Sequence, residues 1–146
     1  MEENSGQLQI IHVMNRNDTF HLTRQTILDS SCVVEDASFS QEIYTLFYHA
    51  ISLEPHEFNS KYKSFAYIKH KGPEAKLYLN AEIIPFQMIM EYIQTKRIDE
   101  RKLIFDSDLT TRLIDLADVL GMTHLMQILR SIQENFKKCS YQMHTI

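Results

Sequence analysis

The first residues of the chain alternate between apolar and polar segments in a way that predicts a β-hairpin. Residues 8–14 (LQIIHVM) form an apolar run typical of a strand covered on both faces. Residues 15–18 are polar and suit a turn. In the next five residues Phe20 and Leu22 fall on one face and polar side chains on the other. We therefore expect two antiparallel strands at the start of the fold.

Two helices are predicted to follow this hairpin. Thr23 is placed to cap the first, which ends near residues 30–31. Ser38 and Gln41 form a capping-box pattern for the second, which the polar residues and proline at 52–55 end. The apolar positions of the second helix recur at helical spacing: Phe39, Ile43, Leu46, Phe47 and Ala50.

The middle of the chain predicts a second hairpin. Residues 64–70 (SFAYIKH) and 75–80 (AKLYLN) have strand character, and Gly72-Pro73 between them is the strongest turn signal in the sequence. The pattern predicts that Leu77 and Leu79 face the core.

After residue 80 the pattern is helical. Pro85 suits the first turn of a helix, where its missing N–H group costs nothing. The buried stripe of that helix is predicted to comprise Phe86, Ile89, Met90 and Ile93. The short apolar stretch at 102–105 favours a brief edge strand.

The last part of the chain predicts a helical hairpin. Asp106 or Ser107 can cap its first helix, Gly121 fits a left-handed C-cap, and Thr123 can cap the second helix. The apolar positions of the two helices repeat at helical spacing: Leu109, Leu113, Leu116, Ala117 and Leu120, then Leu125, Ile128, Leu129, Ile132 and Phe136.

This order of elements predicts an α+β domain with helices collected around a small sheet. The 146 residues suffice for one core, which we place at 8–136 with an insertion at 52–75 and short tails at 1–7 and 137–146. No leader peptide and no membrane-spanning run is visible. Two cysteines far apart in the sequence, Cys32 and Cys139, favour a reduced compartment, so we expect a cytoplasmic or nuclear protein.

Catalytic chemistry finds little support in the sequence. It has no nucleophile elbow, no glycine-rich phosphate loop and no zinc-protease motif. Seven histidines are present, but no pair has metal-binding helical spacing, and His49 and His56 lie seven residues apart. Asp115 and Asp118 are interpreted as part of a solvated helix face. We therefore expect no enzyme, no cofactor and no metal.

The lysines and aromatic residues at 61–71 allow two interpretations. Such a mixture can bind single-stranded nucleic acid through phosphate contacts and base stacking. Alternatively, it marks an edge strand whose lysines prevent pairing with another sheet while its aromatic residues pack inward. The surplus of lysine over glutamate at 54–76 is small and the net charge of the chain is −4, so the edge strand is favoured and nucleic acid is the weaker alternative.

Three segments resemble the superfamily of BTB/POZ domains, Skp proteins and elongin C. Residues 20–28 (FHLTRQTIL) are similar to its second strand and first helix, and residues 86–98 (FQMIMEYIQTKRI) to its central helix, with Lys96 where glycine is usual. Residues 113–136 are similar to its closing helical pair. The positions in register with that pair are Leu113, Ala117, Asp118, Leu120, Met122 and Leu125.

The resemblance implies a BTB/POZ-like α+β fold: a three- to four-stranded sheet with about five helices that end in a helical hairpin. It also implies a non-catalytic interaction domain, for which we expect an adaptor bridging a scaffold, such as a cullin of a ubiquitin ligase, and a partner protein. A homo-oligomerisation domain unrelated to ubiquitin is the alternative. Only seven residues precede the first strand, so we expect no intertwined dimer. Leu53-Glu54 is the nearest remnant of the family's cullin-binding signature.

The resemblance also places a partner surface at the end of the second helix and the loop after it. Its residues in this chain are Tyr48, His49, Ile51, Leu53 and Glu54, with Tyr92 nearby. The alternative is that the insertion folds back and covers them. The C-terminal residues Tyr141 and Met143 are then the second candidates.

Overall fold

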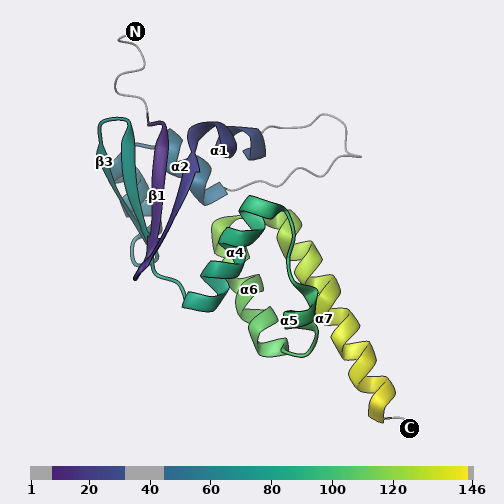
Figure 1. Cartoon of the computed structure of the whole chain (residues 1–146). Helices are drawn as coiled ribbons and strands as arrows, with labels where there is room; N and C mark the ends of the chain where they lie inside the picture. Colours follow the sequence, from purple (N-terminus) through teal and green to yellow (C-terminus); the bar gives the residue numbers. More distant parts are fainter. Residues whose placement is uncertain (1–7, 32–44, 145–146) are drawn as a thin grey trace.

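The computed structural model describes residues 8–31 and 45–144, which form a four-stranded sheet and seven helices (Figure 1). The α+β class predicted from the sequence is confirmed, although the helices outnumber the five expected. The elements in chain order are β1 (Ile10–Asn15), β2 (Asp18–Thr23), α1 (Arg24–Ser31), α2 (Thr45–Ser52), α3 (Pro55–Tyr62), β3 (Ala66–Lys71), β4 (Glu74–Leu79), α4 (Ile83–Thr95), α5 (Glu100–Ile104), α6 (Ser107–Leu120) and α7 (Thr123–His144).

The predicted N-terminal hairpin is present and leads directly into a capped helix. Strands β1 and β2 pair antiparallel around a turn in which Arg16 is left-handed, with φ of 57°. The Thr23 side-chain oxygen accepts a hydrogen bond from the backbone N–H of Thr26 at 3.1 Å. This bond satisfies one N–H of the first turn of α1, so the predicted cap is confirmed.

The second hairpin joins the first through a parallel pair of strands. The sheet order is β2-β1-β4-β3, in which β3 and β4 are antiparallel and β1 and β4 are parallel. Gly72, with φ of 63°, lies in the predicted turn between β3 and β4. Leu77 and Leu79 are buried, as the sequence indicated.

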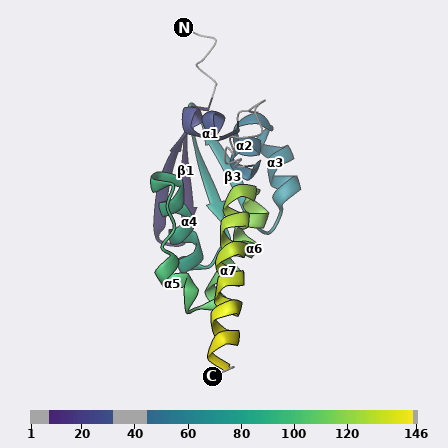
Figure 2. The ribbon, with the colours of Figure 1, turned by 90° about the vertical axis from the view of Figure 1, so that its right-hand side faces the viewer.

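Helices cover one face of this sheet and leave the other exposed (Figures 1 and 2). Ile11 and Val13 of β1 are buried while Ile10 and Met14 are only half-buried, so the expectation that β1 is covered on both faces is wrong. We call the uncovered side the open face. Its outward side chains are Ile10, His12, Met14, Thr19, His21, Thr23, Tyr67, Lys69, Lys71, Glu74, Lys76 and Tyr78.

Strand β3 is an edge strand, as predicted, and a side chain of α3 occupies its outer edge. The amide nitrogen of Asn59 donates to the carbonyl oxygen of Ile68 at 3.1 Å, and its amide oxygen accepts from the Ile68 N–H at 2.7 Å. Asn59 therefore takes the place that a neighbouring strand would fill. Helix α3 itself was not predicted from the sequence.

The central helix α4 follows its predicted pattern, whereas the segment after it does not. Pro85 lies in the first turn of α4, and the predicted stripe from Phe86 to Ile93 is buried. Residues 102–105 were predicted as an edge strand, and this is wrong because α5 contains most of them. The Asp99 carboxylate accepts from the N–H of Arg101 at 3.0 Å, which begins the helix at this point.

The closing hairpin is formed by α6 and α7, as predicted. Asp106 caps α6 by accepting from the N–H of Leu109 at 3.0 Å, and Gly121 ends it in a left-handed conformation with φ of 75°. The carbonyl of Met122 accepts from the N–H of Met126 at 3.0 Å, so Met122 rather than Thr123 holds the N-cap position of α7. Helix α7 continues to His144, through residues assigned to the tail from the sequence.

Some predictions concern positions that the structure does not describe. Cys32 and the predicted capping box of Ser38 and Gln41 lie outside the described residues, as do Phe39 and Ile43. The backbone of α7 is described to His144, but the side chains from residue 136 onward are not. The predicted inward position of Phe136 therefore stays a prediction.

Candidate functional site

The partner surface predicted from the sequence lies at the end of α2. Tyr48 is 41% exposed and Glu54 is exposed. Ile51 and Leu53 are partly buried against the core. The surface that remains available in this region is therefore centred on Tyr48 and Glu54.

Two further residues of that prediction are not available at the surface. Tyr92 is 3% exposed, because α4 packs against α6 and buries side chains on more than one side. His49 is half-buried beside Tyr62 of α3, and its Nδ1 atom lies 2.6 Å from the Tyr62 hydroxyl. The insertion thus folds back over His49, as one alternative anticipated. The second candidates, Tyr141 and Met143, lie in α7 where side chains are not described.

His49 and Tyr62 share a hydrogen bond, and the tautomer of the imidazole decides which of the two donates. Burial, and secondarily the nearby Lys61 cation, lowers the pKa of His49 below its ordinary value of 6.5. Burial also raises the pKa of Tyr62 above 10.0. The lowered pKa favours a neutral His49 in this partly buried position, because protonation would place a charge there next to the Lys61 cation.

This arrangement predicts a pH dependence of stability. Because the pKa of His49 is lower in the folded state, the unfolded chain binds the proton more readily, and stability falls as pH drops below about 6.5. We expect a His49→Gln variant to lose less stability than the natural chain between pH 7.5 and pH 5.5, as measured by urea unfolding. Equal losses in the two proteins would contradict this role of His49.

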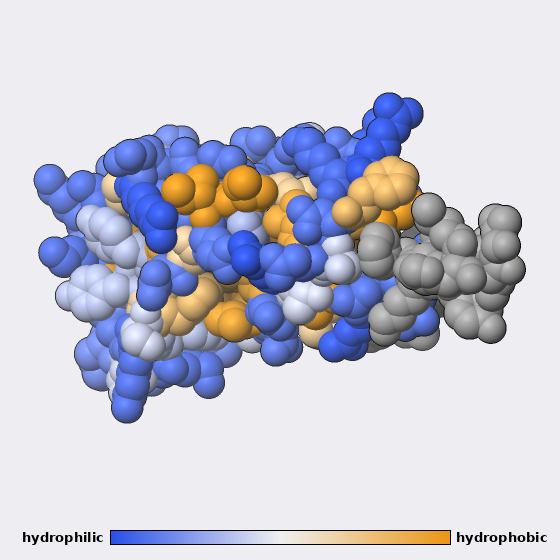
Figure 3. Space-filling view, turned by 90° about the horizontal axis from the view of Figure 1, so that it is seen from below, coloured by the Kyte–Doolittle hydropathy of each residue, from blue (hydrophilic) through white to orange (hydrophobic). Residues whose placement is uncertain are grey.

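A second surface, at the N-termini of α4 and α6, exposes large apolar side chains. Ile83 is 41% exposed, Ile84 58% and Phe105 85%. Beside them lies a pocket of about 410 Å³ whose lining includes Ile84 and Asp106. Figure 3 shows several apolar patches on this underside of the molecule, with hydrophilic surface between them. We call the surface formed by Ile83, Ile84, Phe105 and this pocket the α4–α6 surface.

Ion pairs of Arg112 connect the two helices that carry the α4–α6 surface. Arg112 donates to Glu82 at 2.9 Å and to Asp108 at 2.9 Å, which ties the start of α4 to the start of α6. Phe105 closes the last turn of α5 through its N–H bond to Leu103, and Asp106 next to it caps α6. These bonds fix the backbone on both sides of Phe105, whose side chain is 85% exposed. This exposure was not predicted from the sequence, because Phe105 was assigned to a strand.

Two histidines and a glutamate lie in a row on the open face. His12 Nε2 lies 3.0 Å from Glu74 Oε1, and His12 Nδ1 lies 2.7 Å from His21 Nδ1. In the described part of the chain no serine, threonine or cysteine side chain is hydrogen-bonded to either imidazole, and no group of three potential metal ligands is found. Among the described residues, His12, His21 and Glu74 have no hydrogen-bonded nucleophile, which a catalytic triad requires. We therefore assign them no catalytic role.

Comparison with known proteins gives one informative similarity. No protein-family model matches the chain. An uncharacterized protein of Acanthamoeba polyphaga mimivirus is 37% identical over 134 residues, which cover 90% of this chain and 55% of the relative. The chain thus spans about half the length of the viral protein that it matches. The similarity assigns no activity.

The helices of the chain were also compared with the requirements of a membrane span. Within the described residues, none of them combines the length and the apolar character needed to cross a bilayer.

Proposed function

We propose that this chain is a non-catalytic protein-interaction domain of the BTB/POZ, Skp and elongin C type. Three resembling segments support the proposal, because each forms the element expected of it. Residues 20–28 include the end of β2 and the start of α1, residues 86–98 include most of α4, and residues 113–136 belong to α6 and α7. The buried side chains of all these elements belong to one hydrophobic cluster.

The exposure of Phe105 is the observation that carries this proposal. A phenylalanine buries about 150–250 Å² when it is covered, so leaving 85% of it exposed forgoes a large hydrophobic gain. Rigid aromatic anchors surrounded by polar side chains are typical of interaction hot spots. Arg112, Glu82 and Asp108 are polar residues that line the adjacent pocket, together with Ile83 and Ile84. The occupant that fits is an apolar segment of another protein.

An adaptor needs two separate surfaces, and the structure offers a second one. The region of Tyr48 and Glu54 lies at the end of α2, whereas the α4–α6 surface lies at the opposite end of the molecule (Figures 1 and 2). We assign the first to a scaffold such as a cullin and the second to a partner protein. The two surfaces share no residue, as binding of two partners at the same time requires.

The proposal is tested by quantitative co-purification with variants of each surface. We expect Ile84→Asp with Phe105→Asp to lose one set of partners, and Tyr48→Ala with Glu54→Lys to lose a different set. Val119→Asp is the matched control, since Val119 is a 42% exposed apolar residue elsewhere on α6. Thermal melts must show that every variant is folded.

Two outcomes would contradict the adaptor. If all variants capture the same partners at natural strength, neither surface binds a protein. If light scattering shows a dimer that the Ile84→Asp and Phe105→Asp changes convert into a monomer, the α4–α6 surface serves self-association.

A further inference from the structure

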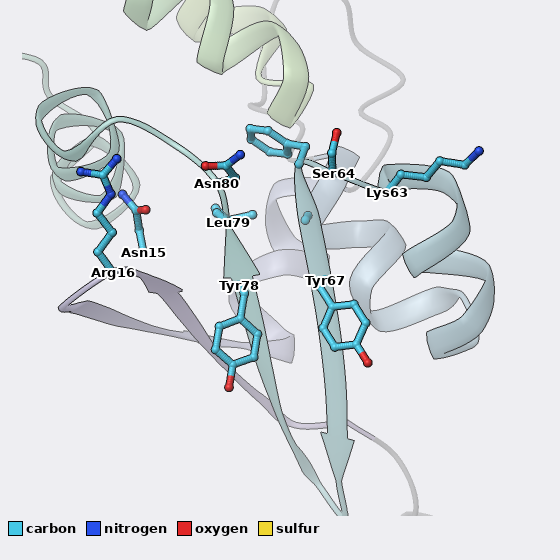
Figure 4. Close-up of a pocket in the computed structure, with 10 residues that line it drawn as sticks. Asn15, Arg16, Lys63, Ser64, Tyr67, Tyr78, Leu79 and Asn80 are labelled. Atoms are coloured by element: carbon cyan, nitrogen blue, oxygen red, sulfur yellow. The ribbon is translucent and has the colours of Figure 1, made fainter.

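Two tyrosines lie side by side on the open face. Tyr67 of β3 and Tyr78 of β4 are direct cross-strand partners, and they are 46% and 39% exposed. Figure 4 shows both rings on the same face of the sheet. The expectation that the aromatic residues of this segment pack inward is wrong for Tyr67, because Ala66 and Ile68 occupy the inward positions of β3. The result is an uncovered aromatic platform.

A row of lysines lies next to this platform. Lys69 and Lys76 are direct cross-strand partners, one step along the same face from the two tyrosines, and Lys71 follows. Like charges opposite each other destabilise a sheet, yet none of these lysines forms an ion pair in the described part of the chain. Glu74 is the one carboxylate among the open-face side chains, and His12 already contacts it. The face therefore carries a local cationic surplus although the whole chain is acidic.

A small pocket lies at the tyrosine end of the face (Figure 4). It has a volume of about 250 Å³, and its lining includes both tyrosines, Arg16, Lys63 and Asn15. Asn15 is 2% exposed, and its amide nitrogen has no hydrogen-bond partner among the described residues. An unsatisfied buried donor is costly, and a ligand that brings an acceptor into the pocket would remove that cost.

We propose that the open face binds single-stranded nucleic acid. Tyr67 and Tyr78 stack against successive bases, while Lys69 and Lys76 contact the phosphates beside them. The Asn15 amide can hydrogen-bond to the edge of a base that enters the pocket. This function goes beyond the protein adaptor, because the face uses neither of the two proposed protein-binding surfaces.

Two features favour this ligand over others that a sheet can bind. A peptide that adds as an extra strand beside the two tyrosines would need the outer edge of β3, but Asn59 occupies that edge at Ile68. Duplex nucleic acid keeps its bases stacked inside, so it cannot use the exposed rings of Tyr67 and Tyr78. A flexible single strand offers both phosphates and accessible base faces to one flat surface.

Fluorescence anisotropy with a labelled oligouridine of about twelve nucleotides tests the proposal, with the matching DNA and a duplex as further arms. We expect Tyr67→Ala with Tyr78→Ala to weaken binding at least tenfold, and Tyr67→Phe with Tyr78→Phe to retain it, because stacking needs the ring and not the hydroxyl. We expect Lys69→Gln with Lys76→Gln to reduce the slope of log affinity against log salt by about 1.4, the value for two lost phosphate contacts.

Matched changes on another face give the control. Tyr48→Ala and Lys61→Gln remove an exposed tyrosine and an exposed lysine from α2 and α3, and they should leave binding unchanged. Absence of binding to both oligonucleotides would overturn the proposal. The proposal would also be overturned if the duplex or heparin bound with equal affinity and the tyrosine-to-alanine variant lost no binding. That result would show attraction to any polyanion. Should that variant fail to fold, the phenylalanine and glutamine variants still decide the question.

Discussion

We expect Leu120→Ala to lower the free energy of unfolding by about 2–5 kcal/mol, the usual range for a leucine truncated inside a core. Leu120 is the last residue of α6 and is 0% exposed. Leu125 and Leu129 of α7 are likewise completely buried, and α6 packs directly against α7. Leu120→Ala removes three carbon atoms from this core. The cavity stays open because the short turn between α6 and α7 restricts the movement of the two helices.

Urea unfolding followed by circular dichroism measures this effect, and the neighbouring residue supplies the control. Val119 is 42% exposed, so Val119→Ala should change the free energy of unfolding by no more than about 0.5 kcal/mol. Equal midpoints for Leu120→Ala and the natural chain would refute the helical hairpin as part of the core.

The sequence predicted those elements whose signals act over a few residues. The cap at Thr23, the turn at Gly72 and the left-handed end of α6 at Gly121 are all found where the pattern placed them. The Thr23 side chain accepts a hydrogen bond from the backbone N–H of the next helical turn. The two glycines adopt the left-handed conformation that a turn or a helix end requires. Such signals do not depend on the rest of the fold, so they could be recognised without it.

Two short helices gave no usable pattern. Phe58 is the buried residue of α3, and Leu103 is the buried residue of α5. One or two apolar positions cannot define a helical period, so α3 was not predicted and the segment of α5 was assigned to a strand. Phe105 was assigned to the same strand, which concealed the most exposed large apolar side chain of the described chain.

The candidate sites depend on contacts between distant parts of the sequence. The parallel pairing of β1 with β4 sets His12 opposite Lys76 and Met14 opposite Tyr78, and no local signal indicates it. The open face forms because β1 pairs with β4 and because Ile68, not Tyr67, points toward the core on β3. Tyr92 was predicted near a surface, but α4 is buried on more sides than one apolar stripe would suggest. Burial of this kind is decided by tertiary packing.

We expect Gly121→Ala to be as damaging as the leucine truncation, although it adds only one methyl group. Gly121 has φ of 75°, a conformation that costs a residue with a Cβ atom about 1–2 kcal/mol. An added Cβ would also overlap the Cβ of Thr45 at the start of α2. Since that atom is attached to the backbone, α2 or the end of α6 must move, and overpacking typically costs about 1–3 kcal/mol more. The expected loss is therefore about 2–5 kcal/mol.

Gly72 separates the two contributions to this loss. It has φ of 63°, but no heavy atom lies within 4 Å of the position its Cβ would take. Gly72→Ala therefore carries the conformational cost alone and should lower the free energy of unfolding by about 1–2 kcal/mol. If urea unfolding gives the same loss for both alanine variants, the close approach of Gly121 to Thr45 contributes nothing to stability. A larger loss for Gly121→Ala shows that the close packing of Gly121 against Thr45 of α2 requires a residue without a side chain.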